Sequence, residues 1–115
     1  MNRIKLVINN KVEKINKEKF FIKRELQSIL NLYAKMVSNG SWKDYSFSSG
    51  FKEVSFNVYQ RASDKPVLRI LKNLKPKHFN EKYIIKDKNG IVLKKSENLS
   101  RLIDKTSWSK LRLVK

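Results

Sequence analysis

The sequence contains no cysteine and a single histidine, His78, in 115 residues. Without cysteine the chain has no disulfide, no thiolate metal ligand and no cysteine nucleophile. One histidine cannot supply the several imidazoles of a typical transition-metal site, and its loop-like context KPKHFN favours a surface residue over a catalytic base. These absences argue against transition-metal chemistry and histidine-dependent nucleophilic catalysis.

Glycine and long apolar runs are also scarce. Three glycines leave no Gly-rich phosphate-binding loop. No apolar run approaches the ~18 residues that span a bilayer, and MNRIKLVINN has too short an apolar stretch for a signal peptide. The acidic residues are scattered, although sequence separation does not exclude that Asp44, Glu53 and Asp64 meet in space. We expect a cytoplasmic protein that has no cofactor and no membrane span. We also expect that it is not an enzyme.

The chain has a large excess of positive charge. It carries 27 Lys+Arg against 10 Asp+Glu, a net charge of +17. Such an excess opposes compaction and attracts polyanions. The 21 Lys, 6 Arg and 11 Asn also fit A/T-rich coding DNA, but exchanging Arg for Lys leaves the charge unchanged. A polyanionic partner is one explanation, and solubility or a protein partner is the other.

The charge is unevenly distributed. Residues 1–24 carry eight basic and two acidic groups, and residues 60–82 carry seven and two. Residues 25–59 carry three of each, whereas residues 105–115 carry four basic groups and no acidic one. A neutral block therefore separates a basic head from a basic hairpin region and a basic tail.

Residues 21–38 have the pattern of an amphipathic helix. The helical spacing in FFIKRELQSILNLYAKMVSNG predicts a buried stripe of Ile22, Leu26, Ile29, Leu30, Tyr33 and Val37. Asn39 and Gly40 follow directly, and glycine accepts the left-handed conformation at which many helices end. We predict one main helix over about residues 21–38.

The middle of the chain has strand and turn patterns. SWKDYSFSSG alternates loosely, and KEVSFNVYQR places Val54, Phe56 and Val58 on one face, so both predict strands. ASDKP has turn chemistry, and VLRILKNL predicts the returning strand. KYIIKDKNGIVLKK predicts a hairpin with Asn89-Gly90 at its turn.

The C-terminal region predicts a short helix over about residues 96–105, with Ser96 as its cap and Leu99, Leu102 and Ile103 facing inward. TSWSKLRLVK is expected as a last strand, and NRIKLVIN as a short strand within a basic N-terminal extension, residues 1–19. We predict that residues 20–115 form a single α+β domain. Its fold is an antiparallel sheet of about four to six strands with helices on one face.

A sheet covered on one face exposes the other, and this makes FNVYQRASDKPVLRILKNLKPKH a candidate binding surface. Aligning the apolar sets places Val58 opposite Ile70, and Tyr59 opposite Arg69 on the outer face. The lysines that follow would continue a basic edge. The predicted nucleic-acid contacts are Tyr59, Arg61, Lys65, Arg69, Lys72, Lys75 and Lys77.

Two interpretations of this face are open. Aromatic rings can stack on bases while Lys and Arg neutralise phosphates. Alternatively, Tyr59 packs on a neighbour and the charges keep a sheet edge soluble. The sequence has no Gly- and aromatic-rich RNA-recognition motif, Gly-x-x-Gly clamp, zinc knuckle or basic zipper. Because lysine acts as a point charge, binding would depend on the phosphate backbone with weak sequence specificity.

Three segments, FIKRELQSILNLYAKMVSNGSWKDYSF, FNVYQRASDKPVLRI and VLKKSENLSRLI, together resemble a small bacterial family catalogued as a domain of unknown function. The motifs that carry the resemblance are Tyr33…Met36-Val37, Trp42…Asp44-Tyr45 and Arg61-Ala62-Ser63…Pro66. The similarity covers about residues 20–105. It implies a cytoplasmic bacterial protein with an N-terminal extension, and it brings no activity, cofactor or catalytic residue. Trp42, Asp44 and Tyr45 fit either a small site or a core tryptophan beside a turn-capping aspartate.

Two functions of different classes remain. The first is a small basic nucleic-acid-binding protein, with RNA favoured over DNA and the ribosome as a candidate partner. The second is a protein-interaction module that docks a partner through the neutral helix block, residues 25–59. Binding to anionic lipid is less supported, because no basic amphipathic helix is evident outside the core. The oligomeric state is open.

Overall fold

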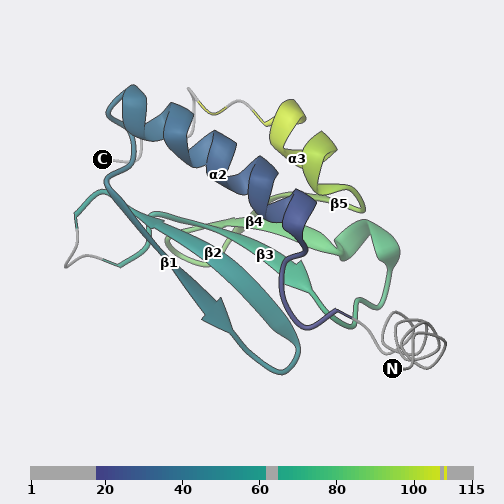
Figure 1. Ribbon diagram of the computed structural model, residues 1–115. Coiled ribbons are helices and arrows are strands. Elements are labelled where there is room, and N and C mark those ends of the chain that lie inside the picture. The colour runs from purple at the N-terminus through teal and green to yellow at the C-terminus, as the bar shows by residue number, and fades with distance from the viewer. Residues whose placement is uncertain (1–17, 62–64, 107, 109–115) are drawn as a thin grey trace, which may run out of the picture.

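The computed structural model describes residues 18–61, 65–106 and 108. An antiparallel five-stranded sheet carries one long and one short helix on the same face (Figure 1). The elements are α2 Lys23–Ser38, β1 Asp44–Ser49, β2 Glu53–Tyr59, β3 Leu68–Asn73, the 3₁₀ turn η1 Phe79–Glu81, β4 Tyr83–Asp87, β5 Val92–Ser96 and α3 Leu99–Lys105. The predicted α+β fold is confirmed. No helix in this part of the chain is long and apolar enough to cross a bilayer.

The strands follow one another across the sheet in the order β1-β2-β3-β4-β5, and each neighbouring pair is antiparallel. β1 and β5 are therefore the two edges of the described sheet. Gly90, with φ of 82°, lies in the turn between β4 and β5 and confirms the predicted hairpin. The pairing of these two strands shifts register between Ile85 and Lys86.

The register between β2 and β3 differs from the prediction. Phe56 pairs with Ile70 and Val58 with Leu68, so the predicted pairing of Val58 with Ile70 is wrong by two residues. A shift of two preserves which residues share a face, so the apolar pattern fits both registers equally. The connection decides between them, because the Val67 amide donates to the Val58 carbonyl at 2.8 Å.

The helix α2 buries a stripe centred differently from the predicted one. Ile29, Leu32 and Met36 face the sheet, whereas Leu30 and Val37 remain exposed. Both stripes satisfy helical spacing, and contact with the sheet selects between them. The helix ends as predicted, with Gly40 at φ 81°.

The core lies between the helices and the sheet and is rich in aromatic rings. Phe56 on β2 is fully buried and contacts Trp42, with ring centroids 6.5 Å apart. Trp42 also meets Trp108 edge to face at 5.8 Å. Trp42 is thus a core residue, while the Asp44 carboxylate accepts the Tyr45 amide at 2.8 Å.

The short helix α3 covers the β5 side of the sheet, with Leu99 and Leu102 buried as predicted. Its cap is Asn98, whose side chain accepts the Arg101 amide at 2.9 Å, so the prediction of Ser96 as the cap is wrong. The Ser96 hydroxyl instead accepts the Asn98 amide, one step before the helix. The strand predicted in NRIKLVIN and most of the one in TSWSKLRLVK lie outside the described residues.

Candidate functional site

Both helices lie over one face of the sheet, and the described residues place no helix over the other (Figure 1). Because side chains alternate along each strand, the residues that flank the buried apolar ones point to this face, here called the open face. It is open only in part, because Ser55, Asn57 and Leu71 on it are 1%, 3% and 1% exposed. The register aligns one row across four strands, here called the polar row. Its members are Ser46, Asn57, Arg69 and Lys86.

A hydrogen-bond network built from neutral groups holds Arg69 in this row. Arg69 Nε donates to Asn57 Oδ1 at 3.1 Å, and Nη2 donates to Ser55 Oγ at 3.5 Å. The Asn57 amide donates in turn to the hydroxyls of Ser48 and Ser46, at 2.9 and 3.2 Å. None of the ion pairs formed within the described ranges involves Arg69. Within the described part of the chain, this network therefore orients the guanidinium through neutral groups.

Lys86 lies directly opposite Arg69 on the neighbouring strand β4. Two like charges in facing positions of an antiparallel pair repel one another. Both side chains are half-buried, so water screens the repulsion less than on a fully exposed surface. An anion that bound between them would relieve it. The sequence analysis missed Lys86, because only the pairing of β3 with β4 brings it beside Arg69.

Tyr59 lies on the same face near the end of β2. Its hydroxyl shares a hydrogen bond of 3.0 Å with that of Ser46, which links it to the polar row. The predicted position of Tyr59 opposite Arg69 is wrong, because Asn57 occupies that position. Tyr59 is one pleat away, nearer the connection to β3.

The other predicted contacts fall at the two ends of the sheet. Arg61 and Lys65 are exposed and flank the connection between β2 and β3. Lys75 and Lys77 are exposed in the loop after β3, at the opposite end, where Lys75 Nζ lies 4.4 Å from the centre of the Phe51 ring. A six-residue strand is about 20 Å long, so only an extended ligand reaches both groups.

Lys72 does not belong to this surface, and its predicted place on an exposed basic edge is wrong. It is two residues from Ile70, so it points to the helix-covered side, where its side chain is 1% exposed. Its ammonium lies 2.8 Å from Glu25 Oε1 and 2.6 Å from Glu18 Oε1, and it donates to the Phe20 carbonyl at 2.9 Å. The sequence pattern treated this lysine as solvated, because its acidic partners are far away in the chain.

The Glu25 carboxylate is the centre of this buried network. It accepts hydrogen bonds from Lys72, from the Ile22 amide at 2.8 Å and from the Tyr83 hydroxyl. Burial, followed by the hydrogen bond to Glu25, raises the pKa of Tyr83 well above its ordinary value. Because these side chains are buried, the network fastens the start of α2 to β3 and β4 instead of presenting groups to a ligand.

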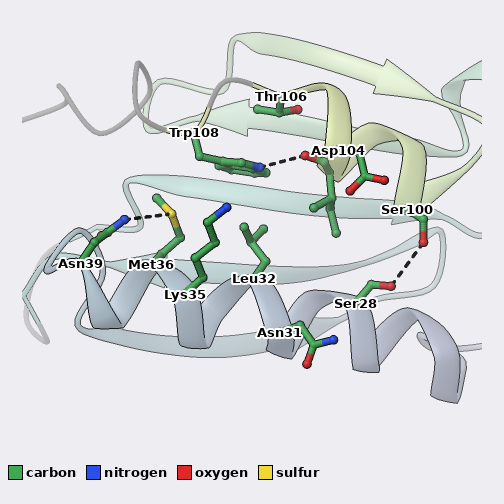
Figure 2. A pocket seen from close by; sticks show the side chains of 11 residues that line it. Ser28, Asn31, Leu32, Lys35, Met36, Asn39, Ser100, Asp104, Thr106 and Trp108 are labelled. Carbon is green, nitrogen blue, oxygen red and sulfur yellow. Dashed lines mark hydrogen bonds between the residues drawn. The ribbon is translucent and has the colours of Figure 1, made fainter.

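A groove lies between α2 and α3 (Figure 2). Its volume is about 570 Å³. Leu32, Met36 and Trp108 form apolar walls, with Lys35 and Asp104 on opposite sides. The groove lies on the helical side and does not join the open face. Within the described ranges, no group of three or more His, Cys, Asp or Glu side chains is arranged to hold a metal ion.

Comparison with known proteins gave one family match. A family model described as "Protein of unknown function (DUF2794)" matches residues 19–103, which is most of the chain. No curated protein and no solved structure matches. The resemblance to a family of unknown function is confirmed.

Proposed function

The chain belongs to the DUF2794 family, and we propose that this member binds nucleic acid through the open face of its sheet, chiefly by contacts with phosphates. One observation carries the proposal. Arg69 and Lys86 face each other across β3 and β4, and the side chains that hold Arg69 within the described ranges are neutral.

A phosphate fits this arrangement for electrostatic reasons. Facing like charges cost up to about 1 kcal/mol in a sheet, and an anion between them turns the repulsion into two attractions. Nε and one Nη of Arg69 already bind the sheet, which leaves its remaining N–H groups for phosphate oxygens. Charge-assisted bonds of this kind are about twice as strong as neutral ones.

The surroundings favour a nucleic acid over a small anion. Tyr59 offers a ring for base stacking, and its hydroxyl bond to Ser46 restricts its orientation. Arg61 and Lys65 extend the positive surface at one end of β3, and Lys75 and Lys77 at the other. The net charge of +17 attracts polyanions over longer distances.

The proposed ligand is single-stranded, with RNA favoured over DNA. An open sheet face accepts splayed bases, which a duplex keeps stacked inside. The described contacts are suited to phosphates and ring faces more than to base edges, so sequence specificity is weak. The proposed activity is binding without catalysis.

Fluorescence anisotropy with a labelled random-sequence RNA tests the proposal. Arg69→Gln and Lys86→Gln should each weaken binding. Each should also make the negative slope of log affinity against log salt shallower by about 0.7, the value for one phosphate contact on a single strand. Lys105→Gln is the matched control, because it removes the same charge from exposed α3 on the other side of the molecule. Equal effects of all three changes would show that only total charge matters and would refute the proposed face.

A further inference from the structure

Within the described residues, the edge strand β1 lacks the usual features that protect a sheet edge. Natural edge strands are usually guarded by lysine, proline, bulges or very short length, because their free backbone groups pair with other chains. β1 has the sequence DYSFSS, without lysine, arginine or proline, and it pairs with β2 in continuous register. No described strand pairs with its other side.

The opposite edge shows the contrast. β5 carries Lys94 and Lys95, and its pairing with β4 is interrupted by a register shift. Although the chain has 27 basic residues, residues 44–51 contain none of them. One edge of the sheet therefore resists pairing with another strand, and the other permits it.

An apolar surface continues from β1 onto the flank of α2. Tyr45 on β1 is 41% exposed, and its ring lies 4.8 Å from that of Tyr33 on the helix. Leu30 and Val37, at 41% and 40% exposure, share the helical stripe of Tyr33 by their spacing of three and four residues. We call β1 together with Leu30, Tyr33 and Val37 the β1–α2 surface.

The charge pattern indicates which partner this surface accepts. The β1–α2 surface contains one charged residue, Asp44, in a chain of net charge +17. Residues 25–59 around it carry three basic and three acidic groups, of which Glu25 is buried against Lys72. A surface that binds an acidic partner is expected to be basic, and the basic residues needed for it are abundant elsewhere in this chain. A second copy of the chain repels the first everywhere except where the charge is balanced. The β1–α2 surface is such a place.

We propose that the β1–α2 surface binds a second copy of this chain, with the two β1 strands pairing antiparallel about a two-fold axis. Such an interface is isologous, since the same residues come from both copies. The antiparallel arrangement brings the Asp44 end of each strand toward the β1–β2 turn of the other copy, where Lys52 carries the opposite charge. Leu30 and Val37 of both copies then pack above the joined strands.

The dimer has a consequence that rests on the proposed function. The two five-stranded sheets become continuous, so their open faces lie side by side on one surface. An extended nucleic acid that contacts both polar rows gains affinity by effective concentration, without any new kind of contact. The dimer itself needs no nucleic acid.

Sedimentation equilibrium of the full chain without nucleic acid tests the proposal, at low and at high salt. We expect a reversible dimer that strengthens as salt rises, because salt screens the repulsion between two copies of charge +17. Leu30→Lys and Val37→Lys should each weaken the dimer by about tenfold or more, a change of roughly 1.4 kcal/mol. Phe79→Lys is the control, since Phe79 is 73% exposed in η1, outside the β1–α2 surface. Circular dichroism checks that all variants fold.

Two results would overturn the proposal. One is a monomer at every concentration and at both salt levels. The other is a dimer that Leu30→Lys and Phe79→Lys weaken equally. Amide hydrogen exchange adds a direct test, because β1 amides should be protected in the dimer and exchange faster in the Leu30→Lys variant. Protection of β1 in a monomeric wild type would mean that another part of the same chain covers the strand. Loss of RNA binding would leave the sedimentation result unchanged, so the two proposals fail independently.

Discussion

Replacing Lys72 by methionine should destabilise the domain more than any surface change. The substitution keeps the length of the side chain but leaves the Glu25 carboxylate buried without its cation. Removing one partner of a buried ion pair costs about 3–5 kcal/mol, because the other charge remains desolvated. Small domains are stable by only about 5–15 kcal/mol, so Lys72→Met should remove a large fraction of the stability.

Urea denaturation measures this loss, and the buried rings of Trp42 and Trp108 provide a fluorescence signal. The matched control is Lys95→Met, which breaks the ion pair with Glu81 at 3.2 Å. Both of those partners are partly exposed, at 47% and 33%, and such pairs contribute about 0–1 kcal/mol. The two lysines should therefore differ by at least about 2 kcal/mol in the free energy of unfolding.

A second substitution separates charge burial from packing. Glu25→Gln keeps an oxygen that can accept the Ile22 amide but removes the negative charge. Combined with Lys72→Met it leaves no unpaired buried charge at this pair, so the double variant should be more stable than Lys72→Met alone. The reasoning is refuted if Lys72→Met costs no more than Lys95→Met, or if adding Glu25→Gln lowers stability further.

Three further predictions concern single positions. The hydrogen bond from Lys72 holds the pKa of Glu18 below its ordinary value. The Glu18 carboxylate therefore stabilises the fold above its unfolded-state pKa, and this contribution disappears as the pH falls through its folded-state pKa. In Glu18→Gln the urea midpoints at neutral and acid pH should lie closer together than in the wild type. Gly40→Ala should cost about 1 kcal/mol in thermal unfolding, because Gly40 has φ of 81°. Asn98→Ala should cost about 1 kcal/mol through loss of the α3 cap, and Ser96→Ala less, as compared by circular dichroism melts.

The open face illustrates how far sequence reasoning reached into the candidate site. The alternation of β2 correctly separated Val54, Phe56 and Val58 from the outer face. It could not choose between registers that differ by two residues, so the neighbour of Arg69 was misassigned. It also could not reveal Lys86, whose distance to Arg69 depends on a third strand.

Lys72 shows the same limit more clearly. The alternation in VLRILKNL places Lys72 on the same face as Ile70, but it does not show that a carboxylate lies on that face to pair with the lysine. Glu25 is 47 residues away in the chain, and Tyr83, its other partner, is 58 residues from it. Such pairs form only when α2 packs on the sheet. A buried charge therefore looks like a solvated one in the sequence.

The sequence by itself determined the features that depend on neighbours a few residues apart. These are the stop of α2 at Asn39-Gly40, the hairpin turn at Asn89-Gly90, the alternating faces of β2 and the α+β class. The tertiary structure alone decided the strand register, the stripe of α2 that is buried, the partners of Lys72 and the facing charges of Arg69 and Lys86. The physical reason is the sequence separation over which each interaction acts. Turn, cap and alternation energies act within one local segment, whereas register and burial depend on contacts between segments that the chain brings together only on folding.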